Sequence, residues 1–167
     1  MAKSLFVEKG YFMIGIVYSS KSGNTELLAN SLNFMESKYC FSVENMGEIK
    51  PVDVLCVGFW CDKGDCDEKM QQFLATLKNQ KIFLFGTAGY GKSKEYFDRI
   101  LTNVKSHIDA SNTVVGTYMC QGKMPLSIRK KFESNPEMLR NFDLALKHPN
   151  DKDIDGLLKS VNHVLYD

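Results

Sequence analysis

The sequence lacks the features that mark membrane proteins and nucleic-acid-binding proteins. No apolar run approaches the ~20 residues that a membrane-spanning helix requires. The first ten residues hold three charged side chains around a short apolar run (residues 5–7), which is unlike a secretory signal. The 21 Lys and Arg residues are balanced by 20 Asp and Glu residues, so no basic excess attracts a phosphate backbone or an anionic membrane. We therefore expect no membrane insertion and no nucleic-acid partner.

Cysteine and histidine are few and scattered. The five cysteines form no Cys-x-x-Cys pair, and the three histidines lie far apart. These residues are Cys40, Cys56, Cys61, Cys66 and Cys120, with His107, His148 and His163. We expect neither a zinc site nor a disulfide scaffold, and unpaired thiols favour the reducing cytoplasm. A redox-active thiol pair at Cys61 and Cys66 is a weaker alternative, because only Lys63 is available to stabilise a thiolate.

The chain length is that of a single domain. A globule of 167 residues buries roughly 70% of the surface that its unfolded chain exposes, so it folds without a metal or a disulfide. Met13 opens the first predicted strand. We therefore expect residues 13–167 to form one domain and residues 1–12 to be an N-terminal extension.

Apolar runs alternate with segments of helical periodicity along the chain. Strands are predicted at residues 12–18, 41–46, 52–58, 81–86 and 113–119, and helices at residues 24–37, 65–77, 92–108 and 151–166. The pattern loosens over residues 121–150, where prolines separate short helical segments. Buried strands that alternate with long helices predict an α/β sandwich with a parallel sheet.

The strongest chemical signal is the segment Ser19–Thr25, between the first strand and the first helix. Hydroxyl, amide and backbone N–H donors gather here at a helix N-terminus, and Gly23 allows close approach to the backbone. The positive end of the helix dipole favours a phosphate at such a position. Because Ser, Asn and Thr also cap helices, a plain N-cap is the alternative, although six donors exceed what one cap needs.

This loop resembles the phosphate loop of flavodoxins, whose pattern Ser/Thr-x-Ser/Thr-Gly-Asn-Thr binds the monophosphate of FMN. All six positions match, as Ser20, Lys21, Ser22, Gly23, Asn24 and Thr25. The order of strands and helices also matches along nearly the whole chain. The resemblance implies a flavodoxin-like three-layer α/β sandwich, with a five-stranded parallel sheet of order 2-1-3-4-5 and FMN as the cofactor.

In a sheet of that order, ligands bind beyond the carboxyl ends of the first and third strands. Two further loops, residues 59–64 and 87–91, begin at this edge, and each contains an aromatic residue, Trp60 or Tyr90. Flat rings suit stacking on an isoalloxazine, and flavodoxins commonly have a Trp and a Tyr at these positions. The alternative is that each ring anchors its loop to the core. Beyond the phosphate loop, the expected cofactor-binding residues are Phe59, Trp60, Cys61, Lys63, Gly64, Thr87, Ala88, Gly89, Tyr90 and Gly91.

Residues 86–93 also satisfy the G-x-x-x-x-G-K-S pattern of nucleotide triphosphatases. Such an enzyme needs an Asp at the end of another buried strand to hold magnesium. The strand predicted at residues 113–119 contains no acidic residue, and Tyr90 is bulky for a loop that wraps a triphosphate. Nucleotide binding at residues 86–93 is therefore the less favoured interpretation.

The flavodoxin resemblance implies an electron carrier between redox proteins rather than an enzyme. The sequence has no nucleophile–base set and no Gly-x-Gly-x-x-Gly fingerprint after a strand. The alternative in the enzyme class is a flavodoxin-like NAD(P)H:quinone or FMN reductase, for which residues 121–150 build or cover a substrate site. A phosphate-binding regulator without redox activity is a third hypothesis.

Two departures from the flavodoxin pattern bear on the redox properties. Typical flavodoxins are strongly acidic, whereas this chain has a formal charge of +1. Cys61 stands where flavodoxins often have a glycine, and a non-glycine residue reaches a positive φ at higher cost. Both differences predict a less negative potential for the second electron than is usual in the family.

The expected partners are redox proteins. Residues 58–70 and 120–124 are similar to a bacterial flavodoxin-like subfamily, some members of which are associated with bilirubin reductase as presumed electron suppliers. This similarity implies a flavin-dependent reductase as the partner. The basic residues of segment 123–131 could dock an acidic partner, and a solvated surface is the alternative.

Overall fold

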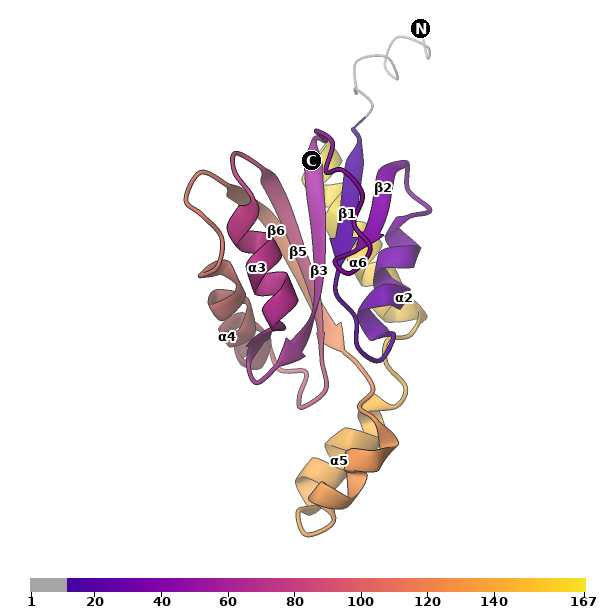
Figure 1. Cartoon of the computed structure of the whole chain (residues 1–167). Helices are drawn as coiled ribbons and strands as arrows, with labels where there is room; N and C mark the ends of the chain where they lie inside the picture. The colour runs from indigo at the N-terminus through magenta and orange to yellow at the C-terminus, as the bar shows by residue number, and fades with distance from the viewer. Residues whose placement is uncertain (1–11) are drawn as a thin grey trace, which may run out of the picture.

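The protein is built on a parallel β-sheet, as a computed structural model that describes residues 12–167 shows (Figure 1). Its strands are β1 (Ile14–Tyr18), β2 (Ser37–Ser42), β3 (Val54–Asp62), β5 (Lys81–Ala88) and β6 (Thr113–Gln121). They run in the order β2-β1-β3-β5-β6. Since these are the five predicted strands in chain order, the predicted fold and the order 2-1-3-4-5 are confirmed. A short sixth strand, β4 (Asp65–Cys66), pairs antiparallel with the end of β3.

Two pairs of helices cover the two faces of the sheet. The pair α3 (Glu68–Thr76) and α4 (Lys94–Lys105) lies on one face, and the pair α2 (Asn24–Leu32) and α6 (Asp151–Tyr166) lies on the other (Figure 1). Because successive side chains of a strand point to opposite faces, each central strand supplies both cores. Val57 and Phe59 of β3 pack toward α3 and α4, whereas Cys56 packs toward α2. This two-sided burial explains why the central strands have uninterrupted apolar sequences.

The predicted position of the edge strand was wrong by about four residues. The strand covers Ser37–Ser42 rather than residues 41–46, and α2 ends at Leu32 rather than at residue 37. Tyr39 is the reason, because its ring lies against Gly15 of β1, where any Cβ would fall 2.4 Å from a ring carbon. The ring of Phe41 stacks on that of Tyr39 with centroids 5.1 Å apart. This cross-strand packing is not visible in the polar sequence of the strand.

Strands extend further toward the carboxyl edge than the sequence predicts. Strand β3 continues to Asp62 rather than ending at Gly58, and β5 continues to Ala88 rather than ending at Gly86. The prediction that residues 59–64 form an open loop is therefore wrong, because Lys63 and Gly64 alone make the turn of a β3–β4 hairpin, with φ of 52° and 82°. Helix α3 starts at Glu68 rather than at residue 65, after the N-cap Asp67.

Residues 123–150 form a separate helical lobe at the carboxyl edge of the sheet (Figure 1). The lobe contains a 3-10 helix, η1 (Leu126–Phe132), and α5 (Pro136–Ala145), which confirms the predicted helical segments. It has its own small apolar core of Met124, Phe132 and Phe142. The lobe thus stands on the edge where the sequence places the binding loops.

The extension predicted for residues 1–12 lies outside the described residues except for Phe12. The Phe12 ring packs edge-on against Tyr166 at 5.6 Å between centroids. Within residues 12–167, no helix has both the length and the apolar character that spanning a bilayer demands.

Candidate functional site

The phosphate-loop sequence forms the junction between β1 and α2, as predicted. Gly23 is the N-cap of α2, and it provides no side chain to cap the helix. Ser20 Oγ accepts from the backbone N–H of Glu26 at 3.2 Å, so one hydroxyl of the loop does satisfy a first-turn donor. The remaining exposed hydroxyl, Ser22, lies beside the positive end of the helix dipole. A helix whose N-cap residue provides no side-chain cap leaves backbone N–H donors available for an anion.

Gly23 is the residue that the backbone of this loop requires. Its φ is +92°, a left-handed conformation that L side chains rarely adopt. A Cβ at this position would meet no heavy atom within 4 Å, so the constraint comes from the backbone and not from crowding. The free space on the Cα side leaves room for a ligand to approach the loop.

Thr25 connects all three predicted loops. Its side chain is fully buried, and its hydroxyl donates to the carbonyl of Phe59 at 3.0 Å and shares a 3.1 Å hydrogen bond with the hydroxyl of Thr87. These contacts tie the start of α2 to strands β3 and β5. Thr25 Oγ1 is therefore committed to holding the loops, which leaves only its backbone N–H for a ligand.

Asn24 fastens the phosphate loop to the helical lobe. Its Nδ2 donates to the carbonyl of Lys123 at 2.9 Å and to Ser22 Oγ at 3.3 Å. A Cβ on Gly122 would lie 2.5 Å from Asn24 Nδ2, so the close approach requires a glycine. Asn24 Oδ1 is buried and has no hydrogen-bond partner among the described residues. A buried acceptor without a donor is costly, which makes this atom a candidate partner for a ligand hydroxyl.

Trp60 lies near the end of β3 beside the phosphate loop and is half-buried. The ammonium group of Lys21 stands 5.2 Å from the centroid of the Trp60 ring, within the range of a cation–π interaction. The sequence did not predict this contact. This contact brings the cation of the phosphate loop, Lys21, against the ring of Trp60.

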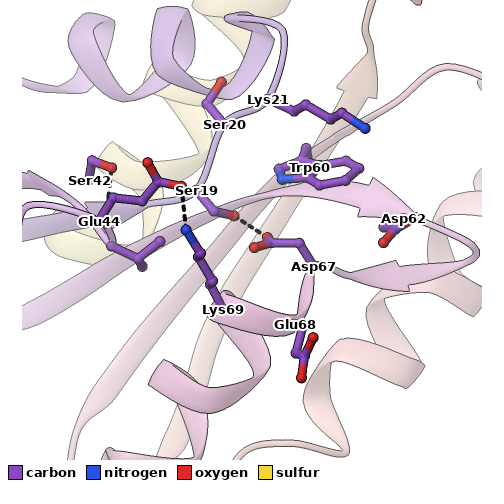
Figure 2. A pocket seen from close by; sticks show the side chains of 11 residues that line it. Ser19, Ser20, Lys21, Ser42, Glu44, Trp60, Asp62, Asp67, Glu68 and Lys69 are labelled. Carbon is purple, nitrogen blue, oxygen red and sulfur yellow. Dashed lines mark hydrogen bonds and ion pairs between the residues drawn. The ribbon is translucent and has the colours of Figure 1, made fainter.

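A cavity of about 540 Å³ opens between the phosphate loop, Trp60 and the start of α3 (Figure 2). Its volume falls in the range of small-molecule sites. Ser19 donates to Asp67, which also caps α3 by accepting from Met70 N at 3.4 Å, and Lys69 pairs with Glu44 at 2.8 Å. The lining residues are Ser19, Ser20, Lys21, Ser42, Val43, Glu44, Trp60, Asp62, Asp67, Glu68 and Lys69. Four of them are acidic and two are basic.

Asp67 is a site residue that the sequence reasoning missed. Its position just before a helical pattern is a typical N-cap signal, and that signal was available in the sequence. The hydrogen bond that Asp67 accepts from Ser19 could not be predicted from the sequence. The two residues are 48 positions apart, and they meet only because β1 and β3 lie side by side.

The third predicted loop is divided between the sheet and the lobe. Thr87 and Ala88 are buried residues of β5, and Gly89 packs so closely under Met124 that a Cβ would lie 2.3 Å from the Met124 side chain. Tyr90 is 52% exposed, and its ring meets Phe132 edge-on at 5.8 Å between centroids. None of residues 87–91 lines the cavity beside Trp60. The arrangement of a ring between Trp60 and Tyr90 therefore stays a prediction.

Phe59 and Cys61 point inward from β3, on the face that carries α3 and α4. The Phe59 side chain is fully buried in the core, so only its backbone takes part in the site. Cys61 is partly buried, and its thiol, whose pKa is raised mainly by burial, interacts with the hydroxyl of Tyr96. Positive φ values occur not at Cys61 but at Lys63 and Gly64, in the turn that follows.

Cys61 and Cys66 are directly opposite each other across the β3–β4 hairpin. Both are free thiols, and burial raises the pKa of each, which makes them weak nucleophiles. Next to them, His107 Nε2 and Asp65 Oδ2 lie 2.8 Å apart and join the hairpin to the end of α4. The sequence did not predict that Asp65, Cys66 and His107 come together.

The G-x-x-x-x-G-K-S motif does not form a phosphate-binding loop of the triphosphatase kind. Residues 86–88 remain in β5, and the hydroxyl of Ser93 accepts from Tyr96 N at 3.2 Å as the N-cap of α4. Only five residues, 89–93, are left between strand and helix, and Gly91 lies against the Tyr96 ring. This geometry does not favour nucleotide binding at residues 86–93.

Comparisons with known proteins agree with this fold. The model of the Flavodoxin domain family matches residues 15–162. Two bacterial relatives are each described as flavodoxin-like domain-containing protein BilS: that of Clostridium symbiosum (strain WAL-14163) is 32% identical over 168 residues, and that of Clostridioides difficile (strain CD3) is 29% identical over 155 residues. Each match covers 83% of this chain and 88% of the relative.

A solved structure extends the comparison to three dimensions. A flavoprotein from Lactobacillus acidophilus NCFM in complex with FMN superposes with a TM-score of 0.54, over 65% of this chain and 93% of the other. At 13% sequence identity this likeness concerns the fold alone. Because the family model matches residues 15–162 and a relative at 32% identity covers 83% of the chain, the protein belongs to the flavodoxin family.

Proposed function

We propose that the protein is an FMN-dependent electron carrier that passes electrons between redox proteins. The observation that carries the proposal is the junction of β1 and α2. There a helix of nine residues begins at a glycine with φ of +92° and without a side-chain cap from its N-cap residue, inside a complete flavodoxin phosphate-loop motif. Such an arrangement is suited to a phosphate monoester.

The residues present fit FMN at the phosphate end and at the polar linker. Backbone N–H groups of the loop and the hydroxyl of Ser22 would bind the phosphate. The buried and unpartnered Oδ1 of Asn24 would accept a hydrogen bond from a ligand hydroxyl, and the half-buried Trp60 ring would stack on a flat ring system. When bound, the flavin supplies one- and two-electron redox chemistry.

The chain's own residues position the cofactor and set its surroundings. Thr25 keeps the three loops in register through its bonds to β3 and β5. Four acidic and two basic groups line the cavity, so the electrostatic potential around Trp60 is weakly negative. The one hydroxyl–carboxylate pair in this lining, Ser19 and Asp67, is buried, and Asp67 also caps α3, so the pair has a structural role and the site favours electron carriage over covalent catalysis.

Titration of the flavin-free protein tests the proposed phosphate site. We expect FMN to bind at least about 100-fold more tightly than riboflavin, because only FMN carries the charged group that the loop recognises. Ser22→Ala should weaken FMN binding and leave riboflavin binding unchanged. Ser31→Ala is the matched control, since it removes a hydroxyl that bonds to Leu27 within the same helix. Equal affinities for FMN and riboflavin would refute the proposal.

A second measurement separates a carrier from the reductase alternative. NADPH added to the FMN-loaded protein should leave the flavin absorption near 450 nm unbleached, and a catalytic amount of a flavodoxin reductase should bleach it. Rapid bleaching by NADPH alone would instead make the protein an NAD(P)H:quinone or FMN reductase. As the partner we propose a flavin-dependent reductase.

A further inference from the structure

The helical lobe, residues 123–150, lies in direct contact with two of the three loops of the proposed site. Asn24 of the phosphate loop donates to the Lys123 carbonyl at 2.9 Å, and the Tyr90 ring lies edge-on to Phe132 at 5.8 Å between centroids. The lobe projects beyond the carboxyl edge of the sheet, so its outer surface is open on several sides (Figure 1). A protein seated on the lobe would therefore stand beside the cofactor loops.

The lobe is basic, although the whole chain is nearly neutral. It contains six Lys and Arg residues and three acidic residues: Lys123, Arg129, Lys130, Lys131, Arg140 and Lys147, against Glu133, Glu137 and Asp143. The charge of Arg129 is balanced by a bidentate ion pair with Asp143, with both N–O distances at 3.0 Å. Lys130 and Lys131 are exposed at the end of η1 and form no ion pair within residues 12–167. The cavity beside Trp60 has the opposite sign, because four acidic and two basic residues line it.

An apolar side chain stands at the start of the same short helix. Leu126 is 70% exposed, and it lies on η1 four residues before Lys130. Tyr90, half-exposed against Phe132, adds an aromatic group beside the lobe. Exposed apolar groups and exposed charges of one sign on the same short element are typical of a protein-binding surface.

We propose that η1, through the exposed side chains of Leu126, Lys130 and Lys131, docks an acidic surface of the redox partner protein. The acidic groups of the partner would border its own cofactor, so that docking brings the two redox centres together. This inference rests on the proposed electron-carrier function. It gives that function a partner of stated charge and a place on the molecule for the partner to bind.

Electron transfer to a protein of known charge tests the docking surface. The probe is ferric cytochrome b5, an acidic protein, and one electron passes from the reduced flavin to the haem iron, which becomes ferrous. The second-order rate constant should fall as ionic strength rises, because salt screens the attraction. At low ionic strength Lys130→Glu/Lys131→Glu should lower it by about tenfold or more, and the difference should vanish in high salt. Leu126→Ser should lower it at every ionic strength.

Lys38→Glu/Lys81→Glu is the matched control. It makes the same change of charge at two exposed lysines at the starts of β2 and β5, on the amino edge of the sheet, and it should leave the rate constant within about twofold of the wild-type value. Cytochrome c, a basic protein, should react faster with the Lys130→Glu/Lys131→Glu variant than with the wild type. Equal rates for the wild type and this variant with both cytochromes would overturn the proposal.

The flavin content of each sample distinguishes the two proposals. If the purified chain binds no FMN, the electron-carrier proposal fails, and the docking surface is then tested by isothermal titration of the flavin-free chain with cytochrome b5. Binding at low ionic strength that Lys130→Glu/Lys131→Glu abolishes supports the surface, and binding that is unchanged in this variant refutes it. Melting temperatures within a few degrees of the wild type show that all variants are folded.

Discussion

Single side chains decide how the loops at the carboxyl edge of the sheet are held. Thr25 belongs to a motif whose hydroxyls are expected to face a phosphate, yet its hydroxyl is buried and bonds to Phe59 and Thr87. Asn24 likewise uses its Nδ2 to bind the helical lobe. The motif therefore contains residues of two kinds, because some are free to contact a ligand and others keep the backbone in place for it.

We expect Thr25→Val to destabilise the protein although it keeps the side-chain shape. The change leaves the Phe59 carbonyl and the Thr87 hydroxyl without their partner in a buried position, which costs about 1–3 kcal/mol. Thr102→Val is the control, because that hydroxyl bonds to Asp98 on an exposed helix surface. Urea denaturation of both variants checks the prediction, and equal losses of stability would contradict it.

We expect the buried thiol of Cys56 to make the protein less stable at alkaline pH. Burial raises the pKa of its thiol to about 12, well above its ordinary value near 9, so the unfolded chain loses this proton at lower pH than the native protein does. The native state then binds more protons than the unfolded state above pH 9, and stability falls as pH rises through the window from 9 to 12. This single thiol should remove about 1.4 kcal/mol of stability between pH 8 and pH 10.

Cys56→Ala separates the proton linkage from the packing. Loss of the sulfur lowers stability at every pH, but it should flatten the decline between pH 8 and pH 10. The free energy of unfolding, measured by denaturant titration at several pH values, supplies the slope. The same slope in both proteins would show that Cys56 ionises equally easily in the native and unfolded states.

The elements show where local signals are sufficient and where they are not. Helix α6 spans Asp151–Tyr166, as its periodicity predicts, because Asn150 and Asp153 form a capping box at its start. Strand β2 differs, since its position follows from the contact of Tyr39 with Gly15 rather than from its own composition. The β3–β4 hairpin was missed because residues 62–65 contain the polar signals of an open loop.

The helical lobe should unfold independently of the sheet. Phe142 is fully buried in the small cluster of the lobe, which does not include side chains of the sheet. Phe142→Ala should therefore raise amide hydrogen exchange over residues 126–145 and leave β1, β3 and β5 protected. Phe83→Ala is the control, because Phe83 lies in the core between the sheet, α2 and α6, where the loss of about 3–5 kcal/mol should affect the whole protein. Exchange that rises equally everywhere in Phe142→Ala would show that the lobe and the sheet unfold together.

The net charge of the whole molecule bears on the potential of its proposed cofactor. With a formal charge of +1, and a radius of roughly 15 Å, the overall charge contributes only on the order of 10 mV to the addition of one electron. We therefore expect the midpoint potential of the second electron to change little with ionic strength, in contrast to the salt dependence that strongly acidic flavodoxins should show.

Spectroelectrochemical titration of the FMN-loaded protein in low and high salt measures this dependence. Lys38→Glu/Lys81→Glu lowers the formal charge by four at the amino edge of the sheet, away from the carboxyl edge, and its potential should rise when salt is added. A wild-type potential that rises as strongly as that of the variant would mean that the local acidic groups near Trp60 outweigh the net charge.

The sequence by itself determined the alternation of strands and helices and the phosphate loop at the end of the first strand, whereas the order of the sheet was implied only by the resemblance to flavodoxins. These features depend on the spacing of apolar residues and on residue types within a few positions, which a chain carries wherever it is placed. Only the tertiary structure decided which hydroxyls of the loop are free, where Trp60 and Tyr90 lie, and that a basic lobe stands beside them. Those outcomes depend on contacts such as Ser19 with Asp67 and Asn24 with Lys123, whose partners are 48 and 99 residues apart and meet only when the sheet has formed.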